Sequence, residues 1–340
     1  MSNDDFWPRL LTQLESGDPA FVAFVADNTS HSPGTRGARM MVRPDGSTEG
    51  TIGGGIMESD IIDAGIDTLE AGETTPQFQR LYHRDKGKGD KSGLICAGHQ
   101  TNVYAVFDST RHLDLVQNIV RRVQEDQTGL VKIDPNGIRL TDEAELGRKT
   151  PPIRFQEPTD TTPWRYEEQL LNWKRAAIIG GGHCGFALSR ILDHLGYTVT
   201  LFDTRDHIET FADNPFARHT IEVDDFAQAG DHIDHPEITH VVVMTMGEPT
   251  DVRGLLGVID DPYPYIGVMG SEAKLTKIRK DLKAEGVDPA LFGKLHAPVG
   301  LEMTSNTPDE IAVSISAELL RLREDLFPHA APAEPKPPSE

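Results

Sequence analysis

A glycine-spaced stretch near the middle of the chain has the residue types and spacing of a phosphate-binding turn. Gly180, Gly182 and Gly185 follow the apolar run "RAAII" and match the pattern G-x-G-x-x-G. Glycines at these positions permit a tight turn and let a pyrophosphate approach the N–H groups at the start of a helix. Asp203 ends the next apolar run, "YTVTLFD", about 20 residues beyond the motif, where a carboxylate accepts hydrogen bonds from an adenosine ribose. The stretch therefore predicts a β-α-β unit that binds NAD(P) or another adenosine dinucleotide.

A second glycine-rich turn lies in the first half of the chain. Gly53, Gly54 and Gly55 separate the strand-like "TEGTI" from the helix-like "IMESDIIDAGIDTLEAG", and Glu58 falls one turn into that helix. The backbone N–H groups of such a turn can bind an oxyanion. A plain strand-to-helix turn, in which Glu58 interacts favourably with the helix dipole, accounts for the same residues equally well.

The elements around these turns indicate two domains. After the dinucleotide motif, the runs "THVVVMTMG" and "YPYIGVMG" alternate with helical patterns, which is typical of a parallel sheet. Before it lie strand-like runs, a hairpin-like "GLVKIDPNGIRL" and a Pro-, Thr- and Glu-rich stretch that we expect to be a linker. The predicted fold class is α/β, with an N-terminal α+β domain and linker over residues 1–170 and a Rossmann-like doubly wound parallel-sheet domain over residues 171–327. Residues 328–340 are expected to be a disordered tail.

Charge and composition exclude several classes of partner. The 340 residues include 33 Lys and Arg against 54 Asp and Glu, a formal net charge of −21. Binding to nucleic acid or to anionic lipid depends on clustered cations, so we expect neither a nucleic-acid nor a membrane partner. The sequence has no run of about 18 apolar residues and begins with an acidic segment, which predicts a cytoplasmic protein. The 13 histidines and two cysteines show no H-x-x-x-H or C-x-x-C spacing, so we expect no dedicated metal site.

Longer motifs extend across most of the chain, from about residue 20 to 325. They are "HSPGTRGARMMVRPDGSTEGTIGGGIMES", "LICAGH", the dinucleotide-binding glycines, "YIGVMGSEAKLTKI" and "LHAPVGLEMTSNTPDEIAVSISAELL". Together they resemble the XdhC/CoxI family of accessory proteins for molybdenum hydroxylases. The resemblance implies an N-terminal domain followed by a Rossmann domain. It also implies binding of molybdenum cofactor, as molybdopterin or its dinucleotide form, sulfuration of the metal, and insertion of the cofactor into a xanthine dehydrogenase-type client.

The resemblance also implies site residues and partners. Gly37 and Arg39 of "GARM", the second glycine turn with Glu58, and the Rossmann glycines match family hallmarks of cofactor binding, and Cys96 matches a family thiol. The implied partners are the client hydroxylase and a cysteine desulfurase that supplies sulfur. A second copy of the chain is a further candidate partner, and the sequence leaves the oligomeric state open. Ile56 and Ala297 stand where the family often has cysteine, so a mechanism that needs two cooperating thiols is not expected here.

Cys96 has a sequence environment that suits thiolate chemistry. It precedes a small-residue turn, and Lys86, Lys88 and Lys91 in the preceding loop would lower the pKa of the thiol and attract a phosphate. Such a thiolate can ligate molybdenum or carry a persulfide. A buried cysteine packed as a small apolar side chain is the alternative interpretation.

Two other functions remain open from the residues alone. An NAD(P)-dependent oxidoreductase would need an acid or base beside the substrate, and His183, His207 and His296 are candidates that no pattern distinguishes. A nucleotide-binding scaffold without chemistry is the second alternative. The sequence favours a cofactor-maturation chaperone over a classical dehydrogenase.

Overall fold

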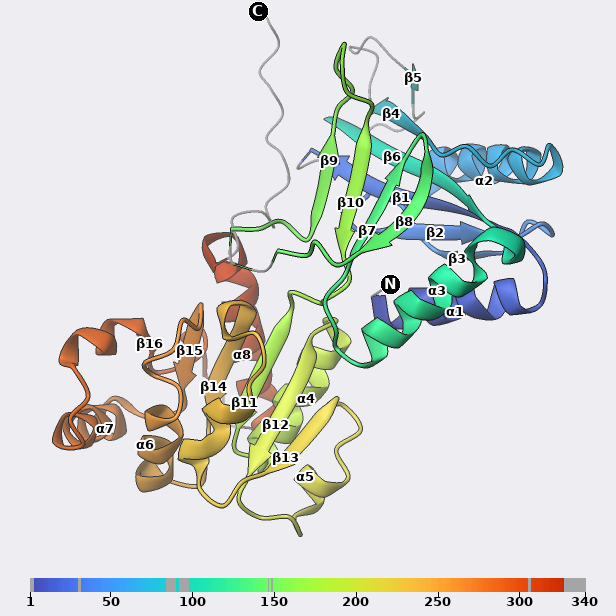
Figure 1. The fold of residues 1–340 in the computed structure, drawn as a ribbon. Helices are drawn as coiled ribbons and strands as arrows, with labels where there is room; N and C mark the ends of the chain where they lie inside the picture. Colours follow the sequence, from blue (N-terminus) through green and yellow to red (C-terminus); the bar gives the residue numbers. More distant parts are fainter. Residues whose placement is uncertain are drawn as a thin grey trace, which may run out of the picture. The chain divides into compact units, whose positions relative to one another are not determined.

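The computed structural model describes residues 3–29, 32–83, 90–91, 98–145, 147, 149–304 and 307–326. The chain forms two compact units (Figure 1). Unit 1 comprises the described residues of Met1–Glu145 and Pro151–Leu171, and unit 2 those of Leu146–Thr150 and Asn172–Ala330. The predicted disordered tail lies outside the described residues.

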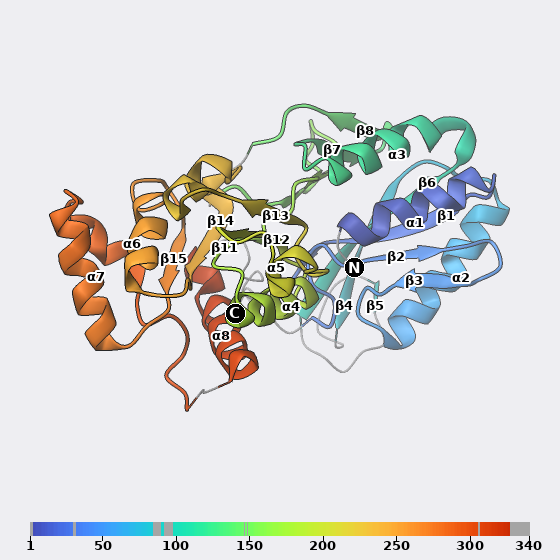
Figure 2. The same ribbon diagram turned by 90° about the horizontal axis from the view of Figure 1, so that it is seen from below.

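The larger sheet of the described part of unit 1 is six-stranded and mostly antiparallel, with the order β3-β2-β1-β6-β4-β5. Its strands are β1 (Ala20–Asn28), β2 (Arg39–Val42), β3 (Thr48–Gly50), β4 (Gln77–His83), β5 (Asp90–Lys91) and β6 (Gly98–Phe107). Helix α2 (Gly55–Glu70) lies on one face, and α1 (Asn3–Glu15) and α3 (Ser109–Gln124) lie on the other (Figure 2). Consecutive residues of β1 therefore pack into opposite cores, Phe21 with α2 and Val22 with α1 and α3, which is why the strand is apolar at nearly every position.

A second, four-stranded antiparallel sheet completes the described part of unit 1, in the order β8-β7-β10-β9. Its strands are β7 (Leu130–Asp134), β8 (Gly137–Thr141), β9 (Ile153–Gln156) and β10 (Arg165–Gln169). The predicted hairpin is β7 and β8. The stretch expected to be a linker instead contains β9 and β10, because Ile153, Trp164 and Tyr166 are buried in the core shared with α1 and α3. The pairing of β10 with β7 joins segments distant in sequence, so local composition does not reveal it.

Unit 2 contains, in its described residues, a six-stranded parallel sheet with the order β13-β12-β11-β14-β15-β16. The strands are β11 (Arg175–Ile179), β12 (Thr198–Asp203), β13 (His219–Glu222), β14 (Thr239–Val243), β15 (Tyr265–Val268) and β16 (Leu295–His296). The strand order reverses between β11 and β14, as in a doubly wound dinucleotide-binding sheet. The predicted fold class, an α+β domain followed by a Rossmann-like domain, is confirmed.

Helices and short 3-10 turns cover both faces of this parallel sheet. The helices are α4 (His183–His194), α5 (Glu209–Ala212), α6 (Glu248–Leu256), α7 (Glu272–Ala284) and α8 (Pro308–Leu326), and the 3-10 turns are Phe226–His232, Pro236–Ile238 and Pro289–Lys294. Helices α6 and α7 pack with Ile266 and Val268 on one face. The opposite face carries α8, which contacts Tyr265, and α8 packs against α4. Within the described residues, no helix combines the length and the hydropathy needed to cross a bilayer.

Candidate functional site

The strongest candidate site in unit 2 is the turn from β11 into α4, at the point where the strand order reverses. Gly182 is the N-cap of α4, and no side chain caps the helix there. A Cβ atom placed on Gly182 would meet no atom within 4 Å beyond the adjacent residues, so the turn is open on the side where a side chain at this position would lie. This arrangement suits a pyrophosphate bound at the helix N-terminus.

The other two glycines of the motif are required by packing. Gly180 has a φ of 123°, and a Cβ there would lie 2.4 Å from the carbonyl oxygen of Met244. A Cβ on Gly185 would lie 2.1 Å from the carbonyl oxygen of Gly180. The three predicted glycines therefore have two functions, since Gly180 and Gly185 bring the backbone segments together and Gly182 leaves the helix start accessible.

Asp203, predicted to bind a ribose, is fully buried at the end of β12 and its carboxylate is already engaged. One oxygen, Oδ2, accepts hydrogen bonds from Gly181 N at 2.7 Å and Arg205 Nη2 at 2.9 Å, and Oδ1 accepts from Arg205 Nε at 2.8 Å. Burial by itself would raise the pKa of Asp203, but the hydrogen bonds from Arg205 and Gly181 hold it below its usual value. Arg205, with 28% of its side chain exposed, is the charged group that this pair presents to solvent.

Sequence reasoning overlooked Arg205, although an arginine two residues after the acidic end of a strand is a local signal. It also overlooked a buried carboxylate on the other side of the reversal point. Asp251 of α6 accepts hydrogen bonds from the backbone N–H and the hydroxyl of Thr245, at 2.9 and 2.6 Å, and pairs with Lys274 of α7. Burial raises the pKa of Asp251. These contacts fix the turn after β14, which forms the other wall of the reversal point.

In unit 1 the second glycine turn is closed by its own glutamate. Gly53, Gly54 and Gly55 all have positive φ values, 130°, 74° and 72°, which residues with a Cβ rarely adopt. Oε2 of Glu58 accepts hydrogen bonds from Gly54 N at 2.9 Å, Ile52 N at 3.1 Å and the Thr51 hydroxyl at 2.7 Å. These amides thus already bind a carboxylate, and an external oxyanion would have to displace Glu58.

Gly37 and Arg39, matched to the family's "GARM" element, lie in a packed region of unit 1. Gly37 has a φ of 87°, and a Cβ there would be 2.8 Å from Cδ1 of Ile153. Arg39 is buried. Its guanidinium pairs with Glu168 at 2.7 Å and lies 5.1 Å from the centre of the Phe6 ring. In this arrangement Arg39 serves the core of unit 1 and is not exposed to a ligand.

Of the two cysteines, the structure describes only Cys184. Cys96 lies outside the described residues, as do Lys86 and Lys88, and the side chain of Lys91 is not described. Cys184, the second residue of α4, is half-buried, and burial raises the pKa of its thiol. A raised pKa disfavours the thiolate, so Cys184 is a poor nucleophile at neutral pH.

Among the three candidate histidines, His296 is the one that lies against both an aromatic ring and a buried carboxylate. His183 and His207 are exposed on the surface. His296 stacks on Tyr265 with ring centres 4.3 Å apart, and its Nδ1 lies 3.6 Å from the buried carboxylate of Glu318. Glu318 also accepts a hydrogen bond from the Tyr265 hydroxyl at 2.8 Å. In the described part of the chain, no group of three or more His, Cys, Asp and Glu side chains is arranged to hold a metal ion.

Comparison with known proteins extends over both units. Residues 13–82 match the model of the XdhC and CoxI family, and residues 177–319 match the XdhC Rossmann domain. "Uncharacterized protein YqeB" of Escherichia coli K12 is 25% identical over 313 residues, which are 91% of this chain and 44% of that protein, so the chain spans less than half of this relative's length.

Two further likenesses cover nearly the full length of both chains. A Bacillus subtilis 168 protein named as a probable xanthine dehydrogenase subunit is 23% identical over 333 residues, 94% of this chain and 98% of that protein. The crystal structure of a protein described as a xanthine dehydrogenase from Bacillus halodurans superimposes with a TM-score of 0.69 at 21% identity and covers 96% of each chain, which is a likeness of fold. Because both domain models of one family match in order along its length, the chain belongs to the XdhC and CoxI family.

Proposed function

We propose that this protein is an accessory protein for a molybdenum hydroxylase of the xanthine dehydrogenase type, and that it binds molybdenum cofactor and assists its sulfuration and insertion. The observation that carries the proposal is the match of both family domains, in order, to one chain. The name of the Bacillus subtilis relative, which aligns over nearly its whole length, agrees with a role beside such an enzyme. The client hydroxylase is the implied partner.

The Rossmann turn fits the diphosphate of a dinucleotide, whether of the pterin or of nicotinamide. The start of α4 has no side-chain cap at Gly182, and the side of the turn where a Cβ of Gly182 would lie is open. N–H groups at an uncapped helix start favour a phosphate. Gly53, Gly54 and Gly55 fit an additional oxyanion only if Glu58 moves, because that carboxylate occupies their turn. The N–H groups at the start of α4 would therefore hold the phosphates. The cofactor, when bound, supplies the molybdenum whose oxo ligand is exchanged for sulfur.

Cys96 is proposed to handle the sulfur, on the strength of the family resemblance. Its thiolate would accept a sulfur atom from a persulfide donor such as a cysteine desulfurase, leaving the donor as a thiol. We expect Cys96→Ser to leave the fold intact and to lower client activation by at least about tenfold, because a hydroxyl is a much poorer sulfur nucleophile. The measurement is reconstitution of an apo client with molybdenum cofactor, a sulfur donor and each variant. Mass spectrometry for one extra sulfur atom on Cys96 gives a second readout.

Cys184→Ser is the matched control and should behave like the wild type, since the raised pKa of Cys184 keeps it protonated. Client activation by Cys96→Ser at the wild-type level would rule out sulfur handling by this residue. The protein would then be a carrier or scaffold for the cofactor.

Arg205 is proposed to select the dinucleotide. Both carboxylate oxygens of Asp203 accept hydrogen bonds from Arg205, so the guanidinium of Arg205 is the group that a ligand would meet. A positive charge at this position favours an anionic 2′-phosphate over a ribose diol. We expect Arg205→Met to weaken binding of NADP⁺ by about tenfold or more, the value of a lost charge-assisted contact, and to leave NAD⁺ binding unchanged or stronger. Titration calorimetry with both dinucleotides measures this difference.

Asp203→Ala is the companion variant. It removes the carboxylate that holds both Arg205 and the Gly181 amide, so it should weaken the binding of NAD⁺ and of NADP⁺ by about 1–3 kcal/mol each. Tighter binding of NAD⁺ than of NADP⁺ by the wild type would contradict the role given to Arg205. Absence of binding of either would leave the Rossmann turn to the pterin dinucleotide alone.

A further inference from the structure

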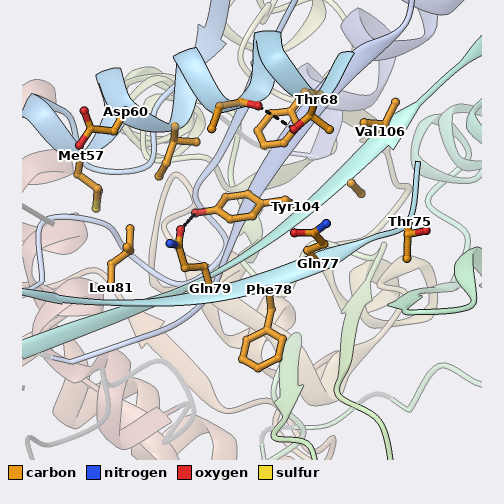
Figure 3. A pocket seen from close by; sticks show the side chains of 14 residues that line it. Met57, Asp60, Thr68, Thr75, Gln77, Phe78, Gln79, Leu81, Tyr104 and Val106 are labelled. Atoms are coloured by element: carbon orange, nitrogen blue, oxygen red, sulfur yellow. Dashed lines mark hydrogen bonds between the residues drawn. The ribbon is translucent and has the colours of Figure 1, made fainter. Parts of the chain in front are cut away.

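A cavity of about 500 Å³ lies in unit 1 between helix α2 and the face of strands β4 and β6 (Figure 3). Helix α2 packs over β1 and β2, and it leaves the half of this sheet face formed by β4 and β6 partly uncovered. The cavity therefore has one helical wall and one flat, pleated wall. Its volume is in the range of small-molecule sites in proteins.

The interior of the cavity suits a flat ring. Tyr104 stacks on Phe21 with ring centres 5.5 Å apart and an angle of 25° between the planes, so its orientation is fixed. Ile61 from α2 and Leu81 from β4 are buried and line the opposing walls. Figure 3 shows the Tyr104 ring between the helix and the strands, with its hydroxyl toward Gln79, to which it donates at 3.1 Å. Aromatic and aliphatic walls that face each other in this way favour stacking of a planar heterocycle.

A buried row of polar side chains on β6 supports Tyr104. Gln100 and Asn102 are fully buried on the same side of the strand as Tyr104. Nε2 of Gln100 donates to the Ile52 carbonyl at 2.9 Å and to Oδ1 of Asn102 at 2.8 Å, and Nδ2 of Asn102 donates to the Tyr104 hydroxyl at 3.4 Å. The row joins the second glycine turn to the cavity through hydrogen bonds. A buried polar side chain destabilises the fold unless its hydrogen bonds are made. The side chains of Gln100 and Asn102 are therefore held in place by these bonds, and they hold this wall of the cavity rigid.

The polar groups at the mouth define the kind of ligand. Among the described residues that line the cavity, Asp60 of α2 carries the only charge, and none is a lysine or arginine. In the described part of the chain the Asp60 carboxylate makes no hydrogen bond or ion pair. The side chain of Gln77, on β4, adds an amide. Such a lining disfavours phosphates and carboxylates and favours a neutral ring with adjacent N–H donors, which a carboxylate accepts in pairs.

We propose that this cavity binds the planar 2-amino-4-oxo ring system that pterins and guanine share. The 2-amino group and the neighbouring ring N–H donate to Asp60, the ring stacks between Tyr104 and the aliphatic side chains, and Gln77 pairs with the remaining polar edge. The identification of the ring as a pterin rests on the proposed function, since molybdenum cofactor carries such a ring. The cavity and its lining support the chemical class independently of that function.

The test is a titration of the full-length protein with neopterin, guanosine and adenosine, followed by calorimetry or ligand-observed NMR. We expect neopterin to bind, and adenosine, which lacks the 2-amino-4-oxo edge, to bind at least about tenfold more weakly. Asp60→Asn should weaken the binding of neopterin at least about tenfold, because the asparagine amide presents an N–H donor where the ring needs an acceptor. Asp63→Asn, an exposed change three residues along α2 and outside the cavity lining, is the matched control and should bind as the wild type does.

Ala64→Phe provides a second variant, since Ala64 is exposed on α2 and lines the cavity. The larger side chain should block neopterin without removing any hydrogen bond of the fold. Tighter binding of guanosine than of neopterin would identify the ring as guanine, and the reverse order as a pterin; both support the ring class. Equal binding of adenosine, or neopterin binding unchanged in both Asp60→Asn and Ala64→Phe, would overturn the proposal. If those variants also bind and transfer intact molybdenum cofactor normally, the proposed function stands without this cavity.

Discussion

Replacement of Gly185 by alanine is expected to destabilise unit 2 by about 4 kcal/mol or more, whereas the same replacement at Gly182 is expected to cost about 1 kcal/mol or less. A methyl group on Gly185 would lie 2.1 Å from the carbonyl oxygen of Gly180, a backbone atom that cannot rotate away. Gly185 lies within α4, where alanine is intrinsically favoured over glycine, so the loss is assignable to this clash. At Gly182 a methyl group meets no atom within 4 Å.

Hydrogen exchange followed by mass spectrometry measures the stability of unit 2 in the two variants, because it reports on unit 2 separately from unit 1. Gly182→Ala has a further expected result. Its methyl group would lie on the open side of the turn that we propose for the phosphates, so dinucleotide binding should fall while stability is retained. Wild-type protection of unit 2 in Gly185→Ala would show that α4 does not approach Gly180 closely enough to exclude a methyl group.

Glu168→Gln is expected to destabilise unit 1 by about 3–5 kcal/mol. Glutamine keeps the shape of the side chain but leaves the buried guanidinium of Arg39 without its counter-charge. Glu168 also accepts a hydrogen bond from the buried hydroxyl of Tyr166 at 2.7 Å. Both partners would lose a charged acceptor in a region that water does not reach. Chemical denaturation, monitored by hydrogen exchange in unit 1, measures the change in the free energy of unfolding.

Glu167→Gln is the matched control one residue away on β10. Glu167 is more exposed and pairs with Lys132 and Arg165 at 3.8 and 3.4 Å, so its neutralisation should cost less than about 1 kcal/mol. The double variant Arg39→Met/Glu168→Leu should recover much of the stability lost in Glu168→Gln, because it removes both charges together. If Glu168→Gln retained wild-type stability but lost cofactor binding, Arg39 would be a ligand-binding residue and not a core residue.

The Rossmann-like domain could be predicted because its signals are local. The apolar runs, the glycines and the alternation of helix and strand each lie within a short segment, and their order along the chain leads to a parallel sheet. The smaller sheet of unit 1 could be predicted only in part. Its hairpin lies in one segment, but β10 pairs with β7 across more than 30 residues, and its buried Tyr166 stands in a polar stretch. A pattern read along a window of residues does not contain that pairing.

By itself, the sequence determined the family motifs, the alternation of strand and helix in the Rossmann-like domain, and the glycine turns at residues 53–55 and 180–185, since these depend on neighbouring residues. Only the tertiary structure decided what each turn faces. Asp203 reaches the Gly181 amide from 22 residues away, and Glu168 reaches Arg39 from 129 residues away. The motif residues Asp203 and Arg39 are therefore bound by partners within the protein, while Gly182 faces open space, because contacts between distant segments exist only once the chain has folded.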